Sequence, residues 1–344
     1  MRNRPIMSML AIAAVFSLFV SCEPVTSGTT ADSPSTVPDP STSGQDPIPP
    51  LDPLPVDPPP SLPPVVLRLM AANLSSGNYQ NYDNLEGIRI MEGCKPDVVM
   101  VQEFNYKTNS AADFQEMANL AITGSTAPAN PAYYCHESGA GIPNGILSRY
   151  PILESGEWDD TYMTDRDFAW ARIDIPGSVD LWAVSVHIKA GNASATSTKV
   201  ADRERRTIEA SSLRDYIIAK IPASDYLALG GDFNTYANDA TSEPCLGIFD
   251  DFLVLSGIWP ADASGNVNTN SGRNSPYDRV LADPDLESLK TATVIGAASF
   301  PGGLVVDTRS YQPLSDLAPA LSTDSAAPSM QHMAVVRDFL VPVR

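Results

Sequence analysis

The chain has 344 residues, a formal net charge of −19 and 43% hydrophobic residues, enough to bury a sizeable core. The acidic balance excludes a general nucleic-acid-binding protein, because such proteins bind chiefly by neutralising phosphates with Lys and Arg. It still admits an enzyme that contacts a few phosphates through a metal ion and local arginines.

The first 21 residues have the pattern of a secretion signal. Arg2 and Arg4 precede the apolar run Met7–Val20, which is short for a membrane span. The run ends in Phe19-Val20-Ser21-Cys22, which resembles the lipobox of bacterial lipoproteins, although Phe19 departs from the usual small aliphatic residue. We predict lipidation of Cys22, which would anchor an exported protein to a membrane, with a plain signal peptide as the alternative.

Residues 22–64 form a second region, rich in Pro, Ser, Thr and Asp and without Lys or Arg. Such a composition cannot bury apolar area, so it predicts an extended, polyproline-like tether. Val65–Arg344 has no further break in composition, and we predict one domain and a monomer. This domain keeps 35 acidic and 20 basic residues, a net charge of −15. Its three cysteines are Cys94, Cys135 and Cys245, which the sequence cannot pair.

The first half of the domain alternates strands and helices. The apolar periodicity predicts strands at Val65–Asn73, Val98–Glu103 and Gly145–Ile152, a hairpin of Ala169–Ile175 with Leu181–Ile188, and helices at Tyr82–Glu92 and Ala111–Ile122.

A long helix is predicted at Ala201–Lys220, with an apolar stripe that should cover a sheet face. Further strands are predicted at Leu227–Asp232, Arg279–Ala282 and Met333–Val341. Mixed strands with helices outside them imply a two-layered sheet sandwich flanked by helices.

The segment Leu227–Thr235 is the most informative stretch of the chain. An apolar strand enters Gly230-Gly231 and then presents Asp232 and Asn234, which should point the same way because strand side chains alternate faces. The pattern indicates a catalytic site, but it also suits an ordinary turn in which Asp and Asn bind their own backbone. Other polar residues lie at the ends of similar apolar runs and favour the site: Asn73, Glu103, Arg166, His187, Asp278 and His332.

Taken in order, these pieces resemble the endonuclease/exonuclease/phosphatase superfamily, the fold of deoxyribonuclease I and apurinic endonucleases. The resemblance covers Val65–Arg344 and implies an α/β fold, a four-layer α/β/β/α sandwich. The pieces that carry it are Asn73, Gln102-Glu103, Ile146–Ile152, Val186-His187, Gly231–Asn234, Tyr277–Val280 and Gln331-His332.

The resemblance implies a metal site. Glu103 ends an apolar strand, where a carboxylate needs a partner, and in the family this residue binds Mg²⁺ with the help of the Asn at 73. A surface lysine is the alternative partner. Asp232 and Gln331 complete the predicted ligand set, and Mn²⁺ or Ca²⁺ could replace Mg²⁺. The family usually has Ser-Asp-His where this chain has Ser329-Met330-Gln331-His332, so we expect weaker metal affinity.

The resemblance also implies catalytic roles. His187 would donate to the scissile phosphate, and His332 would form a dyad with Asp278 for acid or base work. Asp232 would activate or orient the attacking water, helped by Asn234. Whether Asp232 or His332 is the base stays open. Arg166 lies in Asp165–Ala169, which looks like the deoxyribonuclease segment whose arginine contacts the phosphate.

The sequence therefore predicts an exported Mg²⁺-dependent phosphodiesterase, most similar to endonucleases, whose partner is a phosphoester such as nucleic acid. A phospholipid or phosphoinositide phosphoesterase of the sphingomyelinase kind is the alternative. A third hypothesis is a surface protein that binds phosphate without turnover, with Gln331 as the sign of a decayed site. The sequence does not select the substrate or the number of metal ions.

Overall fold

The structure, a computed structural model, describes residues 62–343 except 139–140 and 192–195. Residues Pro59–Arg344 form one compact unit. The predicted signal, the lipidation site Cys22 and nearly all of the tether lie outside the described residues. No helix in the described part of the chain is both long and apolar enough to cross a membrane.

The larger of two main sheets has the strand order β10-β14-β1-β2-β4-β3, and β13 also pairs with β14. At its centre, β1 runs parallel to β2 and antiparallel to β14. The strands of this sheet are β1 (Val65–Ala72), β2 (Val98–Val101), β3 (Tyr133–His136), β4 (Gly145–Ser148), β10 (Lys290–Thr291), β13 (Leu304–Val306) and β14 (Ala334–Val341).

The second sheet has the order β5-β6-β7-β8-β9, in which only β7 and β8 are parallel. Its strands are β5 (Ile152–Trp158), β6 (Phe168–Ile173), β7 (Leu181–His187), β8 (Tyr226–Asp232) and β9 (Asp278–Ala282). A separate small hairpin joins β11 (Thr293–Ile295) to β12 (Ala298–Phe300).

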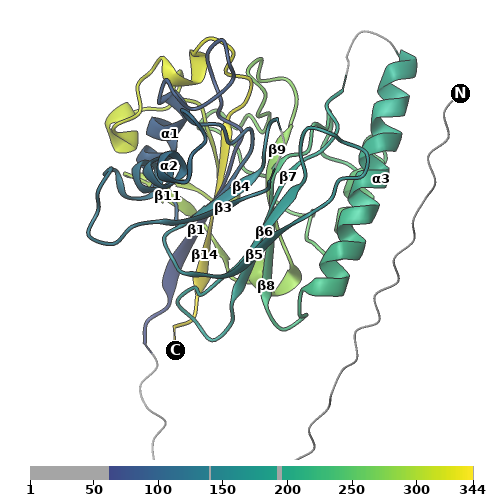
Figure 1. Cartoon of the computed structure of the whole chain (residues 1–344), viewed down its shortest axis with the longest axis horizontal. Coiled ribbons are helices and arrows are strands. Elements are labelled where there is room, and N and C mark those ends of the chain that lie inside the picture. The colour runs from purple at the N-terminus through teal and green to yellow at the C-terminus, as the bar shows by residue number, and fades with distance from the viewer. Residues whose placement is uncertain (1–61, 139–140, 192–195, 344) are drawn as a thin grey trace, which may run out of the picture. The chain divides into compact units, whose positions relative to one another are not determined.

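The two sheets pack face to face, with Leu69 and Met100 of one sheet in the same buried cluster as Ala171 and Ala228 of the other. Helices cover both outer faces (Figure 1). The helices α1 (Glu86–Cys94) and α2 (Ala111–Thr123) pack on the larger sheet, and α3 (Thr196–Lys220) and α4 (Pro244–Asp250) on the other. The predicted four-layer sandwich is confirmed. Short helices complete the fold: α5 (Pro284–Glu287), η1 (Leu314–Leu317) and η2 (Asp324–Ala326).

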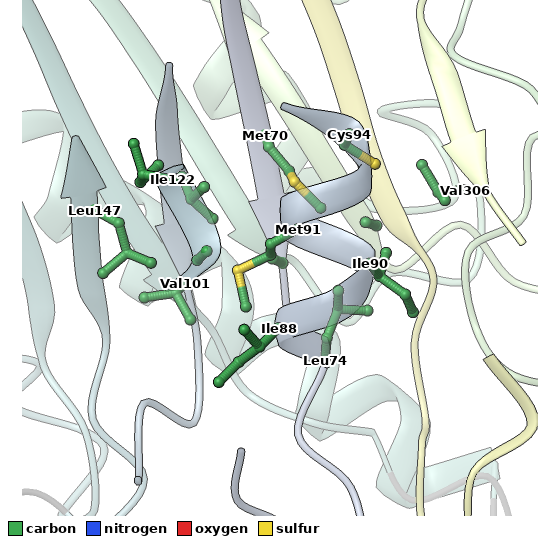
Figure 2. Close-up of a cluster of buried hydrophobic side chains, with 14 of the residues drawn as sticks. Met70, Leu74, Ile88, Ile90, Met91, Cys94, Val101, Ile122, Leu147 and Val306 are labelled. Carbon is green, nitrogen blue, oxygen red and sulfur yellow. The ribbon is translucent and has the colours of Figure 1, made fainter. Parts of the chain in front are cut away.

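The outer core of the larger sheet shows why α1 forms where it does. Ile88 and Met91, three residues apart, lie on the same side of the helix and join one buried cluster with Met70 and Val101 of the strands (Figure 2). The helix therefore closes this face by the same apolar periodicity that predicts it from sequence.

Some predicted elements differ in the structure. The strand expected at Gly145–Ile152 is two strands in different sheets, because the chain turns between Ser148 and Ile152, where Pro151 has no backbone N–H to donate to a ladder. The helix expected from Tyr82 begins only at Glu86, since Leu85 has a left-handed backbone (φ 68°). The cysteines Cys94, Cys135 and Cys245 are free thiols.

Candidate active site

The predicted site residues lie where strands of both sheets begin or end. Register places His187, the last residue of β7, opposite Asp232 at the end of β8, and Asp232 opposite Asp278 at the start of β9. From the facing sheet, Asn73 and Glu103 come just after β1 and β2, and His332 lies just before β14. The fold thus gathers polar groups from six segments at one end of the sandwich.

Asp232 is the centre of this cluster. Its Oδ2 lies 3.2 Å from Nε2 of His187 and 3.5 Å from Nε2 of His332, and it accepts a 3.2 Å hydrogen bond from Nδ2 of Asn73. Its Oδ1 accepts from the backbone N of Asn234 at 2.8 Å. The carboxylate therefore accepts from the backbone two residues further on, as in an ordinary Asp turn, and it also faces the side chains of Asn73, His187 and His332.

The surroundings of the two histidines shift their pKa values in opposite directions. Burial opposes a positive charge on His332, but Asp278, whose Oδ2 lies 2.9 Å from Nδ1, and Asp232 raise its pKa to about 10. Burial, together with Arg166 and His332, lowers the pKa of His187 well below its ordinary value. Burial raises the pKa of Asp232 to about 7, although His332 counters it. These shifts favour the protonated form of His332 and the neutral form of His187.

Two glycines let the strand β8 carry Asp232 into this position. Gly231 has φ 142°, and a Cβ there would come within 2.1 Å of the carbonyl oxygen of Val186 on the neighbouring strand. A Cβ on Gly230 would meet the side chain of Met100 from the facing sheet at 2.5 Å. Gly231 is thus required by its backbone and by close approach to a carbonyl, whereas a side chain at Gly230 would require the flexible end of Met100 to shift.

Asn234 follows the strand with a left-handed backbone, φ 50°. Its Nδ2 donates to the carbonyl oxygen of Ile188 at 3.0 Å, which ties the end of β8 to the end of β7. Between Asp232 and Asn234, Phe233 is fully buried in the core beneath α3 and α4, as the alternation of side chains predicts.

Glu103 and Asn73 offer oxygen atoms that could coordinate a cation beside the Asp232 cluster. The Glu103 carboxylate is only 8% exposed and accepts from the hydroxyl of Ser75. The Oδ1 of Asn73 is buried and meets no hydrogen-bond donor among the described residues. A hard divalent cation prefers such oxygen donors, and a buried acceptor without a donor is an atom that a cation would satisfy. These residues fit a metal site.

Three buried acidic and histidine groups, Asp232, Asp278 and His332, are also close enough to one another to be considered as metal ligands. Their atoms are already engaged, however, with His332 placed between the two carboxylates. With both of its nitrogens engaged, His332 is suited to proton transfer and charge stabilisation and is not assigned as a metal ligand.

Tyr82 and Ser75 belong to this region, although the sequence did not single them out. The buried Tyr82 hydroxyl lies 3.0 Å from the carbonyl oxygens of Ala72 and Gln102, to which it donates, and accepts from the backbone N of Leu74 at 3.1 Å. It therefore joins the ends of β1 and β2, which carry Asn73 and Glu103. In the sequence, the only indication that Ser75 belongs to the site is its position two residues beyond Asn73.

Arg166 lies on the loop between β5 and β6 and is 6% exposed. Its Nε donates to the carbonyl oxygen of His187 at 2.6 Å, and its Nη1 lies 3.3 Å from Asp165. The structure thus brings a buried guanidinium to the end of β7, next to the predicted phosphate donor.

Gln331 differs from the other predicted site residues because its side chain is exposed. Its backbone oxygen accepts from the N of Ser271. His136, which the sequence does not assign to the site, is exposed and packs against Phe114 and Tyr134.

Comparison with known proteins relates the chain to one family. Residues 70–316 match the model of the Endonuclease/Exonuclease/phosphatase family. No curated protein matches the chain.

Solved structures similar to this one include an endonuclease/exonuclease/phosphatase from Beutenbergia cavernae DSM 12333, with 15% identity, a TM-score of 0.49, and coverage of 80% of this chain and 72% of that one. A 3′ phosphatase from Neisseria bound to a product DNA hairpin has 15% identity and a TM-score of 0.49, covering 79% and 99%. An AP endonuclease from Archaeoglobus fulgidus has 14% identity and a TM-score of 0.49, covering 79% and 99%.

Proposed function

Because the chain belongs to the Endonuclease/Exonuclease/phosphatase family, we propose that it is a metal-dependent phosphoester hydrolase, and specifically a Mg²⁺-dependent phosphodiesterase similar to endonucleases. The observation that carries the proposal is the cluster around Asp232. One carboxylate oxygen there meets Asn73, His187 and His332 within 3.5 Å. Such a cluster can orient a water molecule, move a proton and stabilise a phosphoryl group at one place.

Glu103 and Asn73 would hold the metal ion, with Asp232 and Gln331 as further predicted ligands. A bound Mg²⁺ would neutralise negative charge on the phosphoryl oxygens and orient the phosphate for in-line attack. Because Gln331 is exposed and uncharged, we expect it to contribute less to affinity than a carboxylate would.

Asp232 is the better candidate for the base. His332 lies between two carboxylates and carries a proton at neutral pH, so it cannot accept another. It can instead donate a proton or stabilise negative charge. Asp232 accepts hydrogen bonds through both oxygens and has a pKa raised by burial to about 7, which suits proton acceptance near neutral pH.

His187, Asn234 and Arg166 would contact the phosphate. His187 is neutral, and its Nε2 lies 3.2 Å from Asp232, where an incoming phosphoryl oxygen could share its proton. Asn234 is fixed by Ile188 and Arg166 by the backbone of His187, so their positions are set before substrate arrives. Such preorganisation is what stabilisation of a charged transition state requires.

The site recognises a phosphoester and does not identify the group attached to it. A nuclease-like activity is favoured by Tyr277-Asp278-Arg279 and Asp165-Arg166, which resemble deoxyribonucleases. The net charge of −15 over Val65–Arg344 favours the alternative, a phospholipid or other phosphoester that needs no long basic groove. We also propose export and lipid anchoring at Cys22, which would give the enzyme access to either class.

The test is hydrolysis by the purified full chain of plasmid DNA, bis-p-nitrophenyl phosphate and phospholipid vesicles, each with Mg²⁺, Mn²⁺ or Ca²⁺. We expect turnover of at least one substrate that stops on chelation and returns on adding metal. Asp278→Asn should be inactive, whereas Asp285→Asn, at an exposed position, should match the wild type. Absence of hydrolysis with every substrate and ion would refute the proposal and favour a non-catalytic binding protein.

A further inference from the structure

Two carboxyl groups outside the proposed catalytic cluster are buried together. Asp160 lies on the loop between β5 and β6, and Glu209 lies on α3; they are 2% and 0% exposed. The two carboxyls are within hydrogen-bonding reach of each other. Among the described residues, neither forms a salt bridge with a Lys or Arg.

The hydrogen bonds of this pair are incomplete unless one carboxyl is protonated. Glu209 Oε2 accepts from the backbone N of Lys189 at 2.9 Å, and Asp160 Oδ1 accepts from the backbone N of Tyr162 at 3.0 Å. The other oxygens, Oε1 and Oδ2, are buried and meet no donor in the described part of the chain. Ionised carboxylates only accept, so two of them cannot bind each other, and burying both charges is costly.

The same pair is connected to Arg166 by charge and through the neighbouring backbone. The guanidinium of Arg166 acts on both carboxyls through its charge. The backbone N of Asp160 donates to Asp167, the residue after Arg166, at 2.8 Å. Glu209 holds Lys189, two residues beyond His187, whose carbonyl oxygen binds Arg166 at 2.6 Å. Both carboxyls are therefore placed to influence the position of the arginine.

We propose that Asp160 and Glu209 share one proton and act as positioning residues for Arg166. The proton lets the two carboxyls bind each other, and the single remaining charge attracts the guanidinium, whose direct ion pair is with the half-exposed Asp165. This inference rests on the proposed function, because Arg166 is assigned to the phosphate there.

Each carboxyl of the pair is influenced by the charge of Arg166, which lies on the same loop as Asp160, and by the other carboxyl. Burial raises the pKa of Glu209 to about 8, with Asp160 adding to the effect, and burial also raises the pKa of Asp160. Because the folded pKa of Glu209 exceeds the unfolded value, the stability that the proton contributes is complete below the unfolded pKa and is lost as pH rises to about 8.

The first test is thermal unfolding across this pH range, which needs no substrate. Glu209→Gln replaces the protonated acid by a permanent N–H donor, so its Tm should fall less than that of the wild type as pH rises. Glu204→Gln, at an exposed position on the same helix, should keep the wild-type dependence. Equal pH dependence of Tm in Glu209→Gln and the wild type would overturn the shared proton.

The second test is the kinetics of phosphoester hydrolysis. Glu209→Gln should keep kcat/KM within about threefold, whereas Glu209→Ala should lose about tenfold or more, mainly through a higher KM. Asp160→Asn should behave as Glu209→Gln does. Equal losses in the Gln and Ala variants would overturn the positioning role. If the wild type hydrolysed nothing, the proposed function would fail while the unfolding test still decided whether the proton is shared.

Discussion

Glu103 and Asn234 hold their backbones in the left-handed region, with φ of 51° and 50°. For residues other than glycine such a conformation costs roughly 1–3 kcal/mol and persists only when surrounding contacts enforce it. Here the contacts are the Ser75 hydroxyl on Glu103 and the Ile188 carbonyl on Asn234. Both residues are site residues predicted from the sequence, which is where backbone strain is expected to have a functional reason.

We predict that Asp232→Asn lowers kcat by about 10³-fold, because an amide cannot accept a proton. The same change should not destabilise the fold at alkaline pH. Burial raises the folded pKa of Asp232 to about 7, so the stability that its protonated form contributes is lost as pH rises to that value. Above it, the wild type carries a buried charge that Asn lacks. Steady-state kinetics and thermal unfolding at the same pH measure both effects.

The matching variant at the neighbouring histidine is His187→Ala, for which we expect a kcat loss of about 10²-fold or more, because a preorganised donor to the phosphate is removed. Near-normal turnover of His187→Ala would contradict the role given to this side chain. A loss of activity in Asp232→Asn that followed a large fall in Tm would contradict the separation of catalysis from stability.

The sequence predicted the positions of candidate site residues where a polar side chain ends an apolar strand, because the strand end fixes the place and the direction of that side chain. Asp232, His187 and Glu103 are of this kind. Ser75 and Tyr82 were not predictable, because their hydroxyls act on partners that only the tertiary structure brings near. The sequence also did not predict that Gln331 is exposed, because the adjacent residue, His332, is buried.

At the scale of elements, the Tyr82 hydroxyl is the link between the ends of β1 and β2. We predict that Tyr82→Phe costs about 1–3 kcal/mol, because it leaves the Gln102 carbonyl without this donor and the Leu74 N–H without its acceptor. We further expect about tenfold lower kcat, since Asn73 and Glu103 lie next to the released carbonyls. Chemical denaturation and kinetics under saturating Mg²⁺ measure the two effects.

Tyr79 offers the matched control, because it lies on the same loop and is 88% exposed. Tyr79→Phe should leave the free energy of unfolding unchanged. Wild-type stability and kcat in Tyr82→Phe would show that the hydroxyl does not hold the strand ends.

The apolar periodicity predicted most of the elements that build the four layers but missed α4, β5 and β13, and it placed element boundaries less accurately. The strand predicted at Gly145–Ile152 crosses from one sheet to the other, and periodicity does not say which sheet a strand joins. The strand β3 was missed, because Tyr133–His136 is an edge strand that is partly exposed and so lacks a continuous apolar pattern. The helix α1 starts later than predicted because the left-handed backbone of Leu85 interrupts it, which the apolar periodicity does not reveal.

At the scale of the whole molecule, the net charge of −15 over Val65–Arg344 limits how a polyanion can bind. If the substrate is DNA, we predict that KM changes by less than about tenfold between about 50 and 200 mM salt, since only one or two phosphates are neutralised by side chains. Kinetics at fixed Mg²⁺ and varied KCl measure the slope.

The reference for this experiment is the same salt series with bis-p-nitrophenyl phosphate, a small substrate with a single negative charge, which corrects for any effect of salt on the enzyme itself. A steep loss of affinity for DNA alone would mean that many basic residues contact the backbone, contrary to the composition of the domain.

The pairing of β1 with β14 sets the order in which this domain can fold. Among the strands of the described residues, β1 is made first and β14 last, and they lie side by side with Val65 opposite Val341. Until β14 leaves the ribosome, one edge of β1 has no partner, and β10 and β13 have no strand to join. The larger sheet therefore cannot be completed until the last strand has been made, whereas the second sheet pairs without it. A chaperone that meets the growing chain meets a larger sheet with an open edge.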